Sequence, residues 1–98
     1  MEVRIRSVHF DASEKLEAFV EKKVSKLAKF HEDVLSAEVI LKLVKPESAQ
    51  NKEVSISLKA KNGDCFAEKV RDTFEEAVDE CVEAIEKQLI KSKEKSRV

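Results

Sequence analysis

The chain has 98 residues, 42% of them hydrophobic and 40% charged, and its formal net charge is −1. These values fit one domain with a small core, and they exclude an intrinsically disordered chain and a uniformly basic nucleic-acid binder. No apolar run exceeds three residues, whereas a membrane helix needs roughly 20, and the first residues lack the apolar core of a secretory signal. We therefore predict a single cytoplasmic domain over 1–98, with a basic tail expected to fray from about residue 92.

The first two elements predicted are a strand and a helix. Residues 2–8 alternate between apolar and polar side chains, which is typical of a half-buried strand. From residue 14 to about residue 30, apolar side chains recur three and four positions apart, which predicts a helix. Two N-caps are available for this helix: Ser13, or Asp11 in a capping box with Glu14.

The middle of the chain has the pattern of three strands, over residues 36–44, 53–60 and about 64–69. The first two are separated by a polar loop, 45–51, which holds the only proline. The last two are joined by Asn62-Gly63, a dipeptide that favours a type I′ hairpin turn because both central residues need positive φ.

A second helix is expected from a capping box formed by Thr73 and Glu76 to about Ser92. Its apolar stripe consists of Phe74, Ala77, Val78, Cys81, Ile85 and Leu89.

The element order β-α-β-β-β-α predicts an α+β fold with two layers. The first βαβ unit needs a crossover, so its two strands are expected to be parallel, and the remaining strands form a meander. Both helices must cover the one apolar face of the four-stranded sheet. The opposite face is expected to be solvated, with Ser55, Ser57, Lys59 and Lys61 among its residues.

Nothing in the sequence predicts an enzyme, a cofactor, a metal site or a small-molecule substrate. Gly63 is the only glycine, so there is no phosphate-binding loop. Cys65 and Cys81 fall at apolar positions without metal-ligand spacing, and we expect buried, reduced thiols. His9 and His31 follow a strand and a helix, and ordinary surface or boundary positions are expected for both.

Charge is segregated along both predicted helices. Residues 72–86 hold seven acids and no base, whereas residues 87–98 hold five bases and one acid. Four lysines fall within 22–29, three of them on one helix flank with Lys15, while Lys23 points toward the apolar sector with its ammonium group expected in water. One interpretation is a solvated face that complements the helix dipoles, worth ~0.3–1 kcal/mol per charge. The other is a surface that contacts phosphates.

Two segments together resemble the ribosome hibernation promoting factor family, also called the ribosome-associated inhibitor or sigma-54 modulation protein family. These are Leu-Glu-Ala-Phe-Val-Glu-Lys-Lys-Val-Ser-Lys-Leu at 16–27 and Lys-Gln-Leu-Ile-Lys-Ser-Lys-Glu-Lys at 87–95. The resemblance implies a fold like that of double-stranded-RNA-binding domains with an added first strand. It also implies a protein of the short type that binds the small ribosomal subunit in the mRNA and tRNA channel, inhibits translation during starvation, and is a monomer off the ribosome.

The resemblance also implies an rRNA-binding set of lysines that contact phosphates. Lys23 and Lys26 match basic positions of the family on the first helix, and Lys87, Lys91, Lys93 and Lys95 match those on the second; Lys22 and Lys29 share the first cluster. The family often opens its second helix with Asp-Met-Tyr-Ala-Ala-Ile-Asp. This chain has Thr-Phe-Glu-Glu-Ala-Val-Asp at 73–79, so no contact of that tyrosine is carried over.

Two other functions stay open at this point. One is a protein-interaction module that modulates a transcription factor, and the other is a general RNA-binding domain with no tie to ribosomes.

Overall fold

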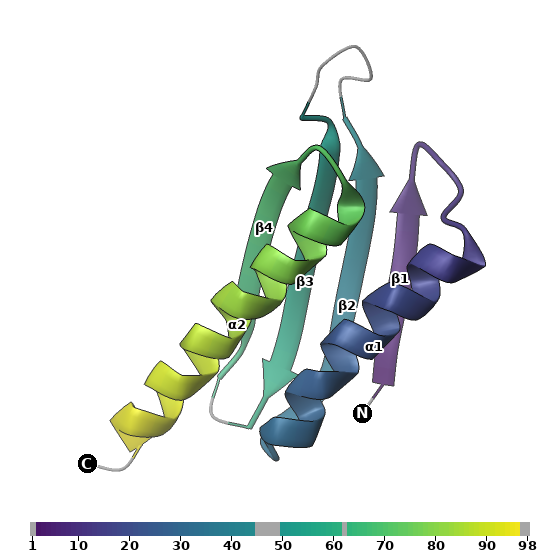
Figure 1. Cartoon of the computed structure of the whole chain (residues 1–98). Coiled ribbons are helices and arrows are strands. Elements are labelled where there is room, and N and C mark those ends of the chain that lie inside the picture. Colours follow the sequence, from purple (N-terminus) through teal and green to yellow (C-terminus); the bar gives the residue numbers. More distant parts are fainter. Residues whose placement is uncertain (1, 45–49, 62, 97–98) are drawn as a thin grey trace.

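A computed structural model describes residues 2–44, 50–61 and 63–96, with the side chains of 92–96 excluded. The elements are β1 (Glu2–Val8), α1 (Glu14–Phe30), β2 (Val34–Leu43), β3 (Lys52–Ala60), β4 (Cys65–Arg71) and α2 (Phe74–Ser96) (Figure 1). The predicted order and the α+β class are confirmed. Helix α2 runs four residues past its expected end near residue 92.

The four strands form one sheet in the order β1-β2-β3-β4. Strand β1 pairs with β2 in parallel, and the other two pairs are antiparallel, as predicted. Both helices lie on the same face of this sheet and run in the same direction (Figure 1). Their C-terminal ends therefore lie at the same end of the molecule.

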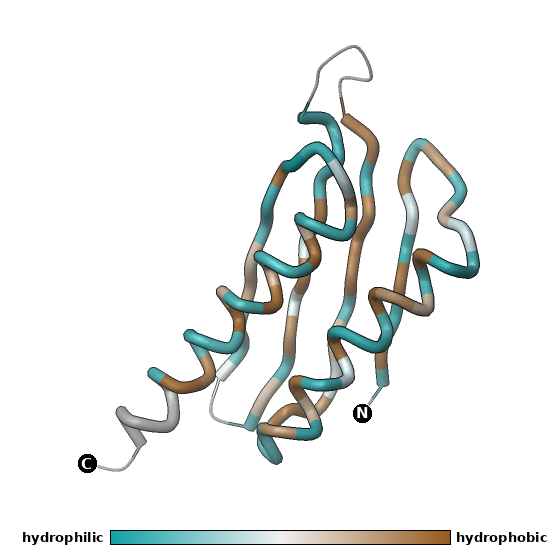
Figure 2. Tube along the Cα trace, viewed as in Figure 1, coloured by the Kyte–Doolittle hydropathy of each residue, from teal (hydrophilic) through white to brown (hydrophobic). Residues whose placement is uncertain are grey.

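The core lies between the sheet and the helices. Apolar segments of both helices face the sheet, and polar segments face away (Figure 2). Each buried side chain of leucine or isoleucine size contributes about 1.5–3 kcal/mol to folding. The whole predicted stripe of α2 is buried, together with Val20, Val24 and Leu27 of α1, Val39 and Leu41 of β2, and Val54, Ile56 and Leu58 of β3.

The N-cap of α1 is Ser13, whose Oγ accepts a hydrogen bond of 3.1 Å from the backbone N–H of Leu16. The predicted capping box of Asp11 with Glu14 is therefore wrong. The ring of Phe10 stacks on that of Phe74, with centroids 4.7 Å apart. This contact ties the connection between β1 and α1 to the start of α2, and Ser13 itself has an extended backbone.

Strand β2 begins two residues earlier than expected. A register shift lies between Val34 and Ser36, and Leu35 is 51% exposed there. The irregularity lets both Val34 and Ala37 point inward, although they are an odd number of residues apart, so the simple alternation fails at this point.

The connection between β3 and β4 is a tight turn. The N–H of Gly63 donates to the carbonyl of Ala60 at 3.2 Å, and Gly63 has φ +132°, a value that favours glycine. Asn62, on which the predicted type I′ turn depends, lies outside the described residues, as do 45–49 of the predicted polar loop. Lys61 belongs to this turn rather than to the open face of the sheet, and its N–H donates to the carbonyl of Asp33 just after α1.

Candidate nucleic-acid interface

Exposed lysines gather at the end of the molecule where both helices finish. Because α1 and α2 run in the same direction, their lysine-rich C-terminal halves lie at one end. We call the exposed members of this set the basic end: Lys22, Lys26 and Lys29 of α1 with Lys87 and Lys91 of α2. Lys93 and Lys95 follow on the same helix, and their side chains lie outside the described residues.

Lys23 differs from the other lysines of α1. Its Nζ lies 3.0 Å from Oδ1 of Asp79 on α2, and 5.6 Å from the centre of the Phe19 ring. The expected packing of the stem is confirmed, because the side chain is only 34% exposed. The ammonium group, expected to be free in water, instead meets a carboxylate that neutralises part of its charge.

A strip of acidic side chains on α2, formed by Asp79, Glu83 and Glu86, separates the lysines of α1 from those of α2. A groove runs between the helices, lined on the α1 side by Lys23, Lys26 and Phe30. Its α2 side is lined by Asp79, Val82, Glu83 and Glu86. The basic end is thus two lysine clusters on either side of an acidic strip, and not one continuous patch.

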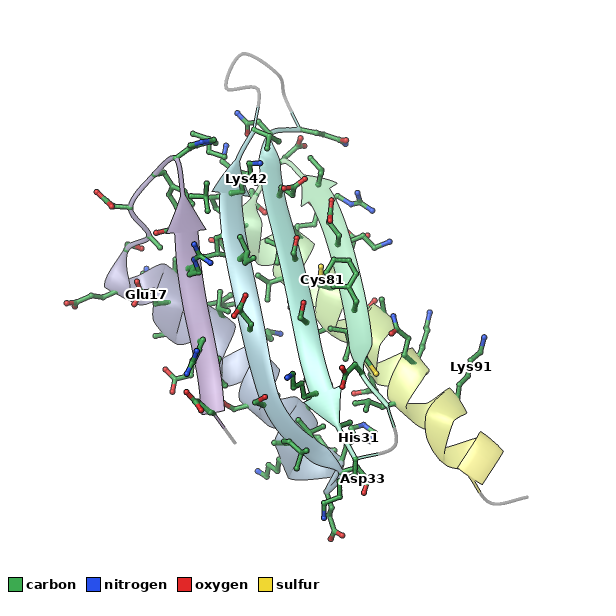
Figure 3. All side chains as sticks on the ribbon, turned by 180° about the vertical axis from the view of Figure 1, so that it is seen from behind. Glu17, His31, Asp33, Lys42, Cys81 and Lys91 are labelled. Atoms are coloured by element: carbon green, nitrogen blue, oxygen red, sulfur yellow. The ribbon has the colours of Figure 1, made fainter. Side chains whose placement is uncertain are left out.

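The α2 cluster lies on the side of that helix away from α1. Gln88 contacts the edge strand β4 through two hydrogen bonds to Phe66, of 2.8 and 3.1 Å. Lys91, one turn further along the same side, projects past the sheet beyond this edge (Figure 3). The lysines of the two helices are therefore presented as separate contacts, spaced by the width of α2.

One interpretation of the charge pattern was a solvated face. Glu80 of α2 does not belong to such a face, because it is paired with Arg71. Glu80 accepts two hydrogen bonds from the guanidinium of Arg71, of 2.5 and 2.8 Å. These hydrogen bonds lower the pKa of Glu80 and raise that of Arg71. The pair fixes the first turns of α2 against the end of β4.

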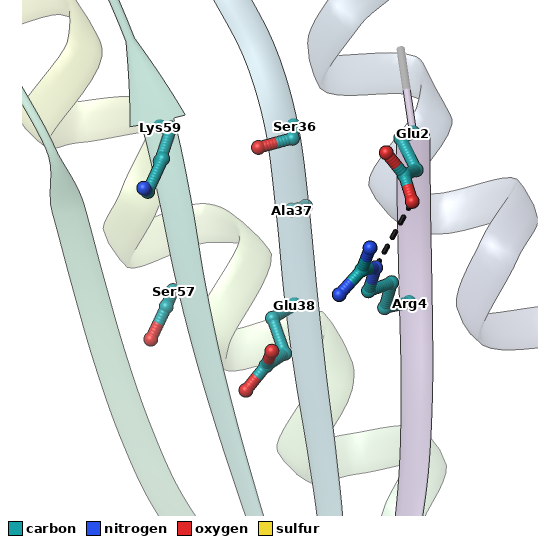
Figure 4. Close-up of a pocket in the computed structure, with 7 residues that line it drawn as sticks. All are labelled: Glu2, Arg4, Ser36, Ala37, Glu38, Ser57 and Lys59. Atoms are coloured by element: carbon teal, nitrogen blue, oxygen red, sulfur yellow. Dashed lines mark hydrogen bonds and ion pairs between the residues drawn. The ribbon is translucent and has the colours of Figure 1, made fainter.

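The open face of the sheet offers a second hollow, lined by side chains from β1, β2 and β3 (Figure 4). Its charges are mixed: Arg4 is held by Glu2 at 2.9 Å, and Lys59 and Glu38 stand nearby on β3 and β2. Such a balance gives no field that would attract phosphate, so this face is a weaker candidate than the basic end.

Both thiols and His31 are buried. Cys65 and Cys81 are both free and buried, as predicted. Burial raises the pKa of Cys65, and it raises that of Cys81 to about 11. His31 is more enclosed than expected, at 8% exposure; it is the C-cap of α1, and its carbonyl accepts a hydrogen bond from the N–H of Val34 at the start of β2. Within the described ranges, no group of three or more His, Cys, Asp or Glu side chains is placed to hold a metal.

No helix in the described part of the chain has the length and apolar character to cross a membrane.

Residues 3–97 match the model of a protein family described as sigma 54 modulation protein / S30EA ribosomal protein. Among solved structures, a ribosomal subunit interface protein from Coxiella burnetii has a TM-score of 0.83 and 22% identity, covering 95% of this chain and 98% of that one. The N-terminal domain of Protein Y from Thermus thermophilus has a TM-score of 0.75 and 21% identity, covering 91% and 96%. No protein with a curated description matches the chain.

Proposed function

Because the chain belongs to the sigma 54 modulation protein / S30EA ribosomal protein family, we propose that it is a ribosome hibernation factor. It binds the small ribosomal subunit in the channel used by mRNA and tRNA, and so inhibits translation in starved or stationary-phase cells. The observation that carries this proposal is the basic end, where two helices that run in the same direction (Figure 1) both carry exposed lysines in their C-terminal halves.

The lysines of the basic end contact phosphates of ribosomal RNA. A lysine ammonium is a point charge without a fixed plane, which suits phosphate contacts better than reading of base edges. The acidic strip of Asp79, Glu83 and Glu86 repels RNA from the groove between the helices. Two separated strands or bends of rRNA therefore fit the clusters better than one continuous backbone does.

The eight lysines named from the sequence do not contribute equally. Those with exposed ammonium groups make the main contacts. Lys23 contributes less, since Asp79 already neutralises part of its charge. Lys93 and Lys95 join the α2 cluster on the strength of the family match. We propose no catalytic step, cofactor or metal for this activity.

The direct test is co-sedimentation of the purified protein with small ribosomal subunits across a range of salt concentrations. Each neutralised phosphate changes the logarithmic salt slope by roughly 0.7–0.9, so four to six contacts give a slope of about −3 to −5. Reversal of Lys26 and Lys91 to Glu should weaken binding by orders of magnitude and flatten the slope, with the melting temperature unchanged.

The control matched in charge to each single reversal, Lys26→Glu or Lys91→Glu, is Lys59→Glu, because Lys59 is an exposed lysine on the open face of the sheet. Lys61 is unsuitable as this control, because its backbone N–H donates a hydrogen bond to the carbonyl of Asp33 beside the end of α1. If the double reversal still binds and inhibits translation like the parent, the proposed surface is wrong. Migration of the native protein with free protein complexes in lysates of starved cells would instead favour a protein-interaction module.

A further inference from the structure

The side-chain amide of Gln88 occupies the free edge of the sheet. Its Nε2 donates to the carbonyl of Phe66 at 2.8 Å, and its Oε1 accepts from the N–H of Phe66 at 3.1 Å. In the sheet that the described residues form, β4 is an edge strand with β3 as its one neighbour.

The register explains why both backbone groups of Phe66 are available. Phe66 stands opposite Ser57 in the antiparallel pair of β3 and β4. Residues of such a pair alternate between bonding across it and directing both backbone groups away from it. Phe66 directs its groups outward, and the single amide of Gln88 satisfies both, as a residue of a fifth strand would.

Small residues on α2 allow this contact. Ala77 and Cys81 are fully buried on the side of the helix that carries Gln88, and the Cys81 thiol lies 3.4 Å from the carbonyl of Val54. The axis of α2 therefore lies close enough to the sheet for the side chain of Gln88 to reach the edge of β4.

Helix α2 leaves the sheet directly after this point. Leu89 is 3% exposed, whereas Ile90 is 45% exposed and Lys91 is also exposed. The helix continues to Ser96, so about 12 Å of it extends beyond Gln88 at 1.5 Å per residue. Figure 1 shows these last turns projecting past the sheet. Among the side chains that the structure describes, Gln88 and Leu89 are thus the last ones that attach the projecting segment to the body of the protein.

We infer that Gln88 is a positioning residue for the α2 lysines: its two hydrogen bonds to Phe66 fix the direction in which the projecting basic segment meets ribosomal RNA. This inference rests on the proposed function. Without the anchor, the segment samples many directions, and the cost of ordering it is met when RNA binds.

The variant that tests this role is Gln88→Met, which keeps the length of the side chain and removes both hydrogen bonds. Hydrogen exchange should become faster at the Phe66 amide and in α2 after Leu89, with β3 unchanged. Binding to small subunits should weaken about tenfold, since a hydrogen bond is worth from a few-fold to about tenfold in an equilibrium constant. Gln50→Met makes the same substitution at an exposed residue before β3 and should change neither measurement.

A double-mutant cycle with Lys91, Lys93 and Lys95, the lysines that follow Gln88 on α2, separates positioning from general destabilisation. In a background where all three lysines are alanine, Gln88→Met should cost less than about twofold in binding. An equal loss in both backgrounds, unchanged exchange, or a lower melting temperature with loss of protection in β3 overturns the inference. If the parent protein itself does not bind small subunits, the proposed function fails and the positioning role fails with it. The exchange data then still decide whether the anchor exists.

Discussion

Lys23 of α1 and Asp79 of α2 form an ion pair with 3.0 Å between Nζ and Oδ1, and this pair joins the two helices across their groove. Both side chains are partly exposed, at 34% and 48%. Exposed pairs of this kind contribute about 0–1 kcal/mol to stability. The larger consequence is electrostatic, because Asp79 withholds one lysine from the surface that we propose to bind RNA.

The first prediction is that Asp79→Asn strengthens binding to small ribosomal subunits. Removal of the carboxylate leaves the charge of Lys23 available, so the affinity should rise a few-fold and the salt slope should steepen by up to roughly 0.7–0.9. The melting temperature should change little. Titration of labelled protein with small subunits at several salt concentrations measures both effects.

Glu68→Gln is the control, because it makes the same change in net charge at an exposed position on β4. If both variants gain the same affinity, the gain reflects total charge, and Lys23 makes no phosphate contact of its own.

The fold was predictable from the sequence because nearly every element has a periodic pattern that one buried face explains. Alternating apolar residues identify β3, and an apolar stripe identifies α2. The apolar side chains of both patterns are buried, as predicted. The start of β2 could not be predicted, since the irregularity at Leu35 breaks the alternation that identifies a strand.

The two lysine clusters could be named from the sequence and from the family resemblance, but the partners of their side chains could not. The contacts of Lys23 with Asp79 and of Gln88 with Phe66 each join elements distant in the sequence. Only the packing angle of the helices decides which side chains meet. The sequence shows seven acids within residues 72–86, but not that some of them lie between the two lysine clusters.

The second prediction concerns the start of α1. Ser13→Ala should lower the free energy of unfolding by about 1 kcal/mol, because it removes the acceptor for the N–H of Leu16. Asp11→Ala should have less than about half of that effect, since Asp11 lies outside the cap. Urea unfolding of the two variants distinguishes them. A larger loss for Asp11→Ala would restore the capping box that the structure excludes.

The third prediction concerns the reactivity of Cys81. Burial raises the pKa of this thiol to about 11, so only about one molecule in a thousand carries the reactive thiolate at about pH 8. In a Cys65→Ser background, native protein should therefore react with a thiol reagent far more slowly than the same protein in urea. Equal rates in the two conditions would mean that α2 does not cover Cys81 in solution.

The last prediction concerns acid unfolding and the pair of Arg71 with Glu80. The guanidinium of Arg71 donates two hydrogen bonds to Glu80 and holds its pKa below the ordinary value of 4.5. Between the lowered pKa of folded Glu80 and its ordinary value of 4.5, the unfolded chain therefore binds more protons at this residue than the folded protein does. The free energy of unfolding rises with pH across this range. The contribution of the pair is fully present above about pH 4.5 and is lost as the pH falls through the lowered pKa of folded Glu80.

Glu80→Gln should be less stable than the parent at neutral pH and should lose less stability between neutral pH and about pH 3. Glu21→Gln makes the same charge change at an exposed position in the middle of α1 and should keep the slope of the parent. Thermal melts of the three proteins as a function of pH measure these slopes. Parallel curves for the parent and Glu80→Gln would mean that Arg71 does not hold this carboxylate in solution.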